Sequence, residues 1–261
     1  MSALRFVLVA AVGLWGLQGC SDSDDAPAKE PEPHATAQTI VDLQDLTANP
    51  NEGYEWFDFR PNVLKLILAG AAETQHIAVL WYTVEDGAVG LHYHSQTESV
   101  YVIDGTQTDG KGSYPTGTVY FNPPGSGHQI SDSSGFFLLA YAAPPDFAST
   151  ALIEEYEPIR IDTTADDLTT AYAFEMPQTD VKTFAVPLVE TGGLKATFIE
   201  TSSAKSTDFV GNYVLVLKGS CKLDDTVYPA QTLVVEKELA PARYVVSAQP
   251  GNPCLALGVS F

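Results

Sequence analysis

The sequence predicts an all-β protein made of two tandem halves, of which the first carries the chemistry. From Tyr54 onward apolar residues alternate with polar ones, turn residues are frequent and helical periodicity is weak. The stretch from His92 to His128 contains three of the chain's five histidines. The part after residue 170 repeats the layout of the first half and contains no histidine. Any chemistry that needs imidazole therefore belongs to the first half.

Six strands are expected in the first half. Each is a short run rich in β-branched or aromatic residues, and turn-forming residues bound it. The expected strands are residues 64–68, 76–84, 98–103, 118–122, 128–131 and 136–142. The stretch 148–170 is acidic and rich in threonine, and we expect it to be a connector with a short helix capped by Asp166.

His92, His94, Glu98 and His128 form a pattern that predicts one metal site. Side chains two residues apart on a strand lie on the same face, so His92 and His94 can bind the same ion. A carboxylate four residues later and a third imidazole from another strand complete a set of three histidines and one glutamate. This set suits Zn, Fe, Mn, Ni and Cu, and we expect one divalent transition metal, with Zn or Fe favoured. The alternative is a group of hydrogen-bonded histidines without a metal.

The residues around these ligands resemble the two signatures of the cupin superfamily. The first signature is matched by His92, His94, Glu98 and Gly105, and the second by Gly117, Pro123, Gly125 and His128. Two positions depart from the signatures, because Asp86 stands where a glycine is expected, directly before Gly87, and Asp132 replaces an asparagine.

The segment 104–128 is similar in particular to the cupin-like domain of zinc-dependent anti-sigma factors and of acetylacetone-cleaving dioxygenases. The resemblance implies a small antiparallel jelly-roll barrel with the metal inside. It does not choose between a regulator and an enzyme, because both share the fold and the ligands.

The second half repeats the first with a shift of 114 residues. The shift places Gly105 on Gly219, 100–102 on 214–216, Tyr114-Pro115 on Tyr228-Pro229, and 119–121 on 233–235. The four ligands fall on Ser206, Asp208, Asn212 and Ala242, none of which is a histidine. We therefore expect two tandem cupin barrels, the second of which is degenerate and packs against the first or covers its sheet edge. A pocket without metal in the second barrel is the alternative.

The N-terminus resembles the signal peptide of a bacterial lipoprotein. Arg5 precedes an apolar run, 6–17, which is too short to span a bilayer but suits a signal peptide. The run ends in Leu17-Gln18-Gly19-Cys20, which resembles a lipobox and makes Cys20 the lipid-carrying residue. Ser21 favours sorting to the outer membrane. We expect a lipoprotein on the periplasmic side, anchored through its lipid, with an ordinary secretory signal as the alternative.

These features give the expected domain organisation. Residues 1–19 are the signal peptide, and residues 20–50 are a lipid anchor and a disordered acidic tether, because their hydrophobicity is low. The metal-binding cupin domain is expected at 51–147, the connector at 148–170 and the degenerate domain at 171–261.

Charge and cysteines narrow the expected partners. The chain has 13 basic and 33 acidic residues, a net charge of −20, which argues against nucleic acid as a partner and against electrostatic binding to anionic lipid.

Besides Cys20 the chain has Cys221 and Cys254. A disulfide between them fits an exported protein, and two buried free thiols are the alternative. A homodimer is left open, since members of the cupin superfamily often pair through their barrel faces.

The expected cavity is apolar. Strand alternation places Val100, Val102 and Ile130 beside the metal ligands, which predicts a pocket for a small apolar organic ligand. The candidate acid–base groups are Tyr82, Tyr101, Tyr120 and Gln129, although alternation points Tyr93 and Tyr101 away from the metal.

Two functions remain open. The first is a metal-dependent, dioxygenase-like enzyme, since four protein ligands leave up to two coordination positions open. The second is a non-catalytic binding or sensory module in which the metal holds the barrel together. The anti-sigma function is not expected to carry over, because no sigma-binding helical domain is recognisable between Cys20 and Tyr54 and the protein is expected to be exported.

Overall fold

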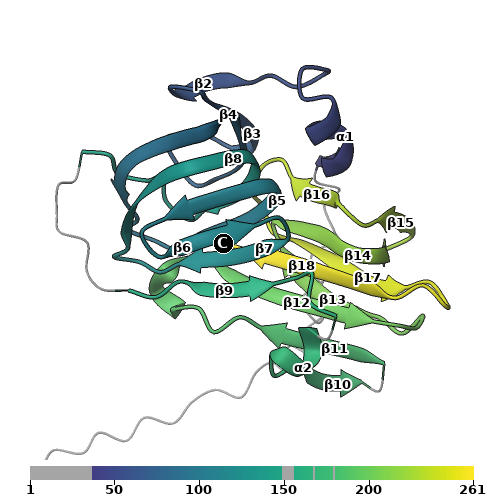
Figure 1. Ribbon diagram of the computed structural model, residues 1–261. Coiled ribbons are helices and arrows are strands. Elements are labelled where there is room, and N and C mark those ends of the chain that lie inside the picture. The colour runs from purple at the N-terminus through teal and green to yellow at the C-terminus, as the bar shows by residue number, and fades with distance from the viewer. Residues whose placement is uncertain (1–36, 149–155, 167, 179) are drawn as a thin grey trace, which may run out of the picture. The chain divides into compact units, whose positions relative to one another are not determined.

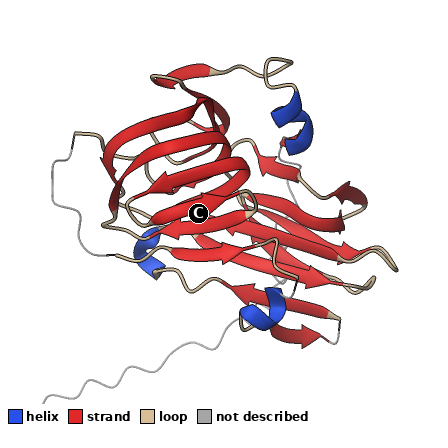
Figure 2. Cartoon of the chain, in the orientation of Figure 1, coloured by secondary structure: helices blue, strands red, loops and turns tan. Residues whose placement is uncertain are grey.

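The computed structural model describes residues 37–148, 156–166, 168–178 and 180–261 (Figures 1 and 2). Two antiparallel sheets make up nearly all of it, which confirms the predicted all-β class. No helix in the described ranges is long and apolar enough to cross a membrane. The expected signal peptide, Cys20 and most of the expected tether lie outside the described residues.

The first sheet has the order β2-β3-β4-β8-β5-β7-β9, with β6 paired to β5. Its strands are β2 (Phe57–Arg60), β3 (Val63–Gly70), β4 (His76–Tyr93), β5 (Glu98–Asp109), β6 (Gly112–Pro115), β7 (Thr118–Asn122), β8 (Gly127–Tyr141) and β9 (Ile159–Asp162). All six expected strands are present, and the last two are one long strand, β8. The register between β4 and β8 shifts between Tyr82 and Gly87 and twice more before His92, and such irregularities bend a strand and increase its twist.

The second sheet has the order β1-β16-β14-β18-β12-β11-β10, and β13, β15 and β17 pair beside this path. Its strands are β1 (Gln38–Asp42), β10 (Glu175–Gln178), β11 (Val181–Ala185), β12 (Lys195–Thr201), β13 (Thr207–Gly211), β14 (Tyr213–Leu223), β15 (Thr226–Pro229), β16 (Thr232–Glu236), β17 (Ala242–Ala248) and β18 (Cys254–Ser260). The helical segments are α1 (Leu43–Ala48), α2 (Leu168–Ala171) and the short 3-10 turn η1 (Glu190–Gly192).

The internal repeat is visible in matching backbone contacts. Gly105 and Gly219 both adopt positive φ, 87° and 67°, at the same place in their barrels. The backbone N–H of Thr116 donates to Gly105 O at 3.0 Å, and that of Ala230 donates to Gly219 O at 2.8 Å. The donor and acceptor in the second pair lie 114 residues after those in the first. This confirms the expected arrangement of two related barrels.

Two strands lie outside the predicted barrel boundaries, which the structure therefore corrects. Residues 38–48 were expected in the disordered tether of 20–50, but they form β1 and α1, and β1 pairs with β16 of the second sheet. Val41, Leu43 and Leu46 are buried there, so a short apolar alternation was hidden by the acidic residues before it. The expected connector, 148–170, contains β9, which pairs with β7 of the first sheet. A short helix, α2, lies at the end of this connector as predicted.

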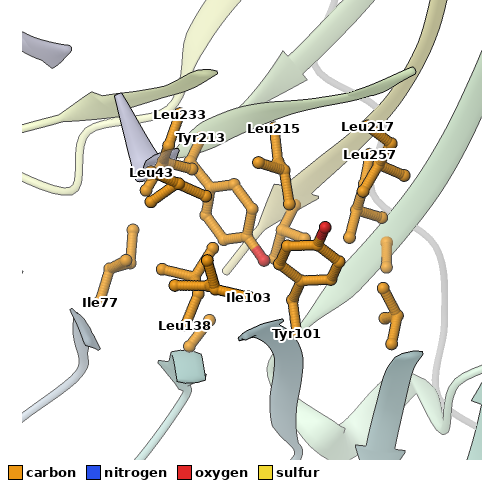
Figure 3. Close-up of a cluster of buried hydrophobic side chains, with 14 of the residues drawn as sticks. Leu43, Ile77, Tyr101, Ile103, Leu138, Tyr213, Leu215, Leu217, Leu233 and Leu257 are labelled. Atoms are coloured by element: carbon orange, nitrogen blue, oxygen red, sulfur yellow. The ribbon is translucent and has the colours of Figure 1, made fainter. Parts of the chain in front are cut away.

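The main hydrophobic core lies between the two sheets (Figure 3). Ile77, Tyr101, Ile103 and Leu138 face Tyr213, Leu215, Leu217, Leu233 and Leu257 across it, and Leu43 lies beside Leu233 on the side of the second sheet. The hydroxyl of Tyr101 lies 2.8 Å from Gln231 Nε2, so this tyrosine points into the core between the barrels. The second barrel is therefore a packing partner for the first.

The positions that correspond to the metal ligands carry structural contacts in the second barrel. Asp208 is exposed and forms an ion pair with Arg243 at 2.8 Å. Asn212 is buried and accepts a hydrogen bond from Phe261 N at 2.8 Å. The ring of Phe209 packs so closely on Gly211 that a Cβ added there would lie 2.3 Å from it. Asp208 and Asn212 therefore make contacts within the second barrel.

Cys221 and Cys254 form a disulfide that joins β14 to β18, with their Cα atoms 4.9 Å apart. The bond closes a loop with a sequence separation of 33 residues. We expect the Cys221→Ala/Cys254→Ala variant to have a free energy of unfolding about 2–4 kcal/mol lower than the wild type, because the unfolded chain is no longer cross-linked. Urea unfolding of the variant and of wild-type protein with dithiothreitol measures this loss. Equal stability with and without reductant in the wild type would contradict it.

Candidate metal centre

Three strands bring the four predicted ligands together. His92 lies at the end of β4 and His94 directly after it, Glu98 begins β5, and His128 is the second residue of β8. His92 and His128 are register partners in the ladder between β4 and β8, which explains how residues far apart in sequence meet. All four side chains are buried.

The ligand atoms converge at distances that suit one ion. His94 Nε2 and His128 Nε2 are 3.1 Å apart, and Glu98 Oε2 lies 3.3 Å from the first and 3.6 Å from the second. The ligand atoms of His92, His94 and His128 all lie within 4.8 Å of one another. Two ligands bonded to one ion at about 2.1 Å lie about 3.0–3.4 Å apart, depending on the angle between them. The distances of His94 from His128 and from Glu98 fall in this range, and His92 completes the group of three histidines that could hold one ion.

Hydrogen bonds fix two of the imidazole tautomers. His92 Nδ1 lies 2.9 Å from Gly90 O, and His128 Nδ1 lies 2.9 Å from Asp109 Oδ2. Because the carbonyl and the carboxylate accept, both Nδ1 atoms carry hydrogen and both Nε2 atoms keep a lone pair. The free Nε2 lone pairs of His92 and His128 therefore belong to the group of ligand atoms that could hold a cation.

Burial keeps His92 and His94 neutral, which is the form that binds a metal. It lowers the pKa of His92 to about 3, with further contributions from His128 and His94. It also lowers the pKa of His94 well below the usual value of 6.5, and His128 contributes again.

Asp109 and Asn122 hold two of the ligands in place, and the sequence did not reveal them. Asn122 Nδ2 donates to Glu98 Oε2 at 2.8 Å. Burial alone would raise the pKa of Asp109, but the hydrogen bonds from His128 and from the backbone of Lys111 and Gly112 outweigh it and lower the pKa. Asp109 also starts the turn between β5 and β6, so in the sequence it reads only as a turn residue.

The carboxylate of Asp109 predicts a measurable effect on metal affinity. We expect the Asp109→Asn variant to bind the metal about 10–100-fold more weakly, because the amide orients His128 but no longer makes it more basic. Competition with a chromophoric chelator measures the affinity. Asp104→Asn is the matched control, since Asp104 lies on the same strand and is exposed. Equal affinities in both variants would contradict the role of Asp109.

A small cavity borders the ligands. Its volume is about 10 Å³, enough for about one water molecule. The apolar part of its wall is Leu80, Val89, Ile130, Leu139, Phe59, Pro145 and Phe147, and the polar part is Tyr82, Gln107, Tyr141, His92, Glu98 and His128. Of the three residues that the sequence placed beside the ligands, Ile130 lines the cavity, whereas Val100 and Val102 pack in the core of the same barrel. The phenol and amide groups of the wall were not all foreseen.

The predicted acid–base candidates are divided between the cavity and other places. Tyr82 lines the cavity, and Tyr120 donates to Gln107 Oε1 at 2.6 Å inside the same barrel. Tyr101 points to the second barrel, as strand alternation predicted. Gln129 is exposed, so its prediction as a candidate was wrong: its neighbour His128 faces inward and alternation turns Gln129 outward.

Tyr141 is a cavity residue that the sequence analysis missed. It hydrogen-bonds Glu98, and its ring is parallel to that of His94, with centroids 6.2 Å apart. Burial raises the pKa of its hydroxyl well above 10, and Glu98 raises it further. Tyr141 therefore stays protonated and donates to the carboxylate.

Residues 44–144, which contain this site, match the family model of the ChrR cupin-like domain. This part of the chain belongs to the cupin superfamily. The resemblance inferred from the sequence is thereby confirmed, and the three-histidine site makes the protein a metal-binding cupin. Of the two departures from the cupin signatures, Asp132 adopts a positive φ of 47°, which asparagine and aspartate both tolerate. No curated protein matches the sequence.

Solved structures share the fold of this cupin at low identity. A candidate dioxygenase from Nostoc punctiforme is 10% identical, with a TM-score of 0.56, over 87% of this chain and 84% of that chain. A cupin 2 conserved barrel domain protein from Leptotrichia buccalis is 10% identical, with a TM-score of 0.53, over 85% and 95%. A mutant salicylate 1,2-dioxygenase from Pseudoaminobacter salicylatoxidans, in complex with gentisate, is 11% identical, with a TM-score of 0.51, over 90% and 84%. At these identities the likeness shows the fold alone.

Proposed function

We propose that this cupin is a metal-dependent, dioxygenase-like enzyme that acts on a small organic molecule. The observation that carries the proposal is the convergence of three buried imidazoles and Glu98 beside a cavity whose wall is partly apolar. Four protein ligands leave up to two positions of an octahedral ion open, and an open position distinguishes catalytic from structural metal sites.

The residues around the site have distinct tasks in this proposal. A bound transition metal such as Fe supplies the redox and Lewis-acid chemistry. Leu80, Val89 and Ile130 exclude water and hold the apolar part of a substrate. Burial raises the pKa of Tyr82, so its hydroxyl stays protonated and can donate to an oxygen of the substrate.

The proposal includes export and lipid anchoring through Cys20, with the cupin on the periplasmic side of the membrane. The apolar run before Cys20 supports it. The disulfide between Cys221 and Cys254 adds support, because disulfides persist in oxidising compartments.

A non-catalytic, metal-stabilised binding or sensory module is the second candidate. One observation favours it: the cavity of about 10 Å³ leaves no room for an organic molecule unless a wall residue moves. In that case Zn is the expected metal, and its contribution is stability rather than turnover.

Metal analysis and oxygen consumption separate the two candidates. Protein purified from the periplasm is analysed for bound metal and then assayed with small β-diketones and phenolic compounds. The enzyme proposal predicts a redox-active metal at about one ion per chain and substrate-dependent oxygen uptake, which the His92→Ala variant loses. Stoichiometric Zn, with no oxygen uptake after reloading with Fe(II), would contradict it and favour the module.

A further inference from the structure

Lys65 is a buried amine close to the metal centre. It lies on β3, is 1% exposed, and its Nζ is 2.7 Å from His76 Nε2. His76 Nδ1 is 2.7 Å from the carbonyl of Thr74, so Nδ1 carries the hydrogen and Nε2 accepts from Lys65. Among the described residues no carboxylate lies within ion-pair distance of Lys65. Its remaining N–H groups therefore have no anionic partner in the described part of the chain.

The amine of Lys65 lies behind the wall of the metal-site cavity. Its Nζ is 4.8 Å from the ring centroid of Phe59 and 5.0 Å from that of Tyr141, and both rings line the cavity. Burial lowers the pKa of Lys65 to about 8, while the nearby charge of Glu98 acts in the opposite direction. Lys65 is thus close enough to the centre for its charge to act there.

A second cation lies on the same aromatic ring. The guanidinium of Arg60 is 4.5 Å from the ring centroid of Phe59 and 3.8 Å from that of Phe147. Phe147 in turn packs on His92, with centroids 5.0 Å apart. The chain has 33 acidic and only 13 basic residues, yet two cations meet at one ring of this cavity. Two like charges in an apolar wall repel each other, and an anion between them attracts both and outweighs that repulsion.

We infer that the site takes an organic carboxylate, whose anionic group binds Lys65 and Arg60 in the space where Phe59 and Phe147 now pack. The rest of the molecule then reaches the metal ligands through the cavity. This inference rests on the proposed function, since it names the substrate class of the same site. The opposing interpretation is that Lys65 only fills the barrel as the hydrogen-bond partner of His76.

Benzoate and benzamide test the inference, because they have nearly the same shape and differ in charge. Calorimetry on the metal-loaded protein is expected to show that the wild type binds benzoate more tightly than benzamide. In Lys65→Met the ratio of the two affinities is expected to fall about 10–100-fold, the range for a hydrogen bond to a charged group. Lys195→Met is the matched control, since Lys195 is exposed on β12 of the second barrel, and it keeps the wild-type ratio.

A structure of the wild-type protein with benzoate decides the matter even where Lys65→Met does not fold. We expect a carboxylate oxygen within hydrogen-bond distance of Lys65 Nζ. Benzoate bound only to the metal, with Lys65 still bonded only to His76, would overturn the inference, as would equal wild-type affinities for the two probes. Oxygen uptake is measured separately: its absence beside an intact benzoate preference contradicts the enzyme proposal alone. Turnover of neutral diketones without a benzoate preference contradicts this inference alone.

Discussion

Replacing His128 by alanine is expected to strip the metal from the purified protein and to lower its melting temperature by roughly 10 °C. His128 Nε2 is 3.1 Å from His94 Nε2 and 3.6 Å from Glu98 Oε2, so its loss opens the ligand set at its centre. A ligand that binds only the folded state at a thousand times its Kd stabilises that state by about 4 kcal/mol. For a domain of this size each kcal/mol corresponds to about 2–4 °C.

The neighbouring residue supplies the control for this experiment. Gln129 lies on the same strand with an exposed side chain, so Gln129→Ala is expected to keep both metal and melting temperature. A chelator should lower the melting temperature of the wild type and of Gln129→Ala but leave that of His128→Ala unchanged. Stoichiometric metal in a His92→Ala/His128→Ala variant would contradict the site itself.

Acidification is expected to destabilise the protein through His76. This side chain is fully buried, and burial, followed by the charge of Lys65, lowers its pKa to about 4. In the unfolded chain the pKa is about 6.5, so the unfolded state binds the proton first. The contribution to stability is complete above pH 6.5 and is lost as the pH falls towards 4, by about 3 kcal/mol.

Urea unfolding at pH 7 and pH 4 measures this loss. His76→Asn is the comparison, because asparagine does not titrate in this range and can still donate to the carbonyl of Thr74. The variant is expected to lose about 3 kcal/mol less than the wild type between the two pH values, after both have been stripped of metal. Parallel pH profiles for the two proteins would show that His76 does not titrate as inferred.

The strands and the ligand pattern of the first barrel could be predicted because their signals are local. His92 and His94 lie on the same face of a strand because side chains alternate with a period of two. Glu98 follows His94 by only four residues, so the three side chains can be grouped from local sequence alone. His128 was assigned to the same site from the ligand pattern and not from periodicity, because it lies 30 residues after Glu98 on another strand. The structure places it opposite His92 in the ladder.

The parts that the sequence did not reveal depend on contacts between distant segments. β1 and β9 have five and four residues, and nothing within such short runs says which sheet they join. Asp109 looks like a turn residue until β5 and β8 bring it to His128. Lys65 reads as the outward-facing residue of an alternating strand, whereas it is buried behind the cavity wall.

The pairing of β1 with the second sheet determines which contacts resist a pulling force on the N-terminal side of β1. Gln38 Nε2 donates a hydrogen bond to Glu236 Oε1, 198 residues away in the sequence. Five register pairs join β1 to β16. A pull on the N-terminal side of β1 is therefore taken first by the second sheet. The barrel that holds the metal ligands lies off this load path, so tension at the N-terminus reaches the ligands only after β1 has been peeled away.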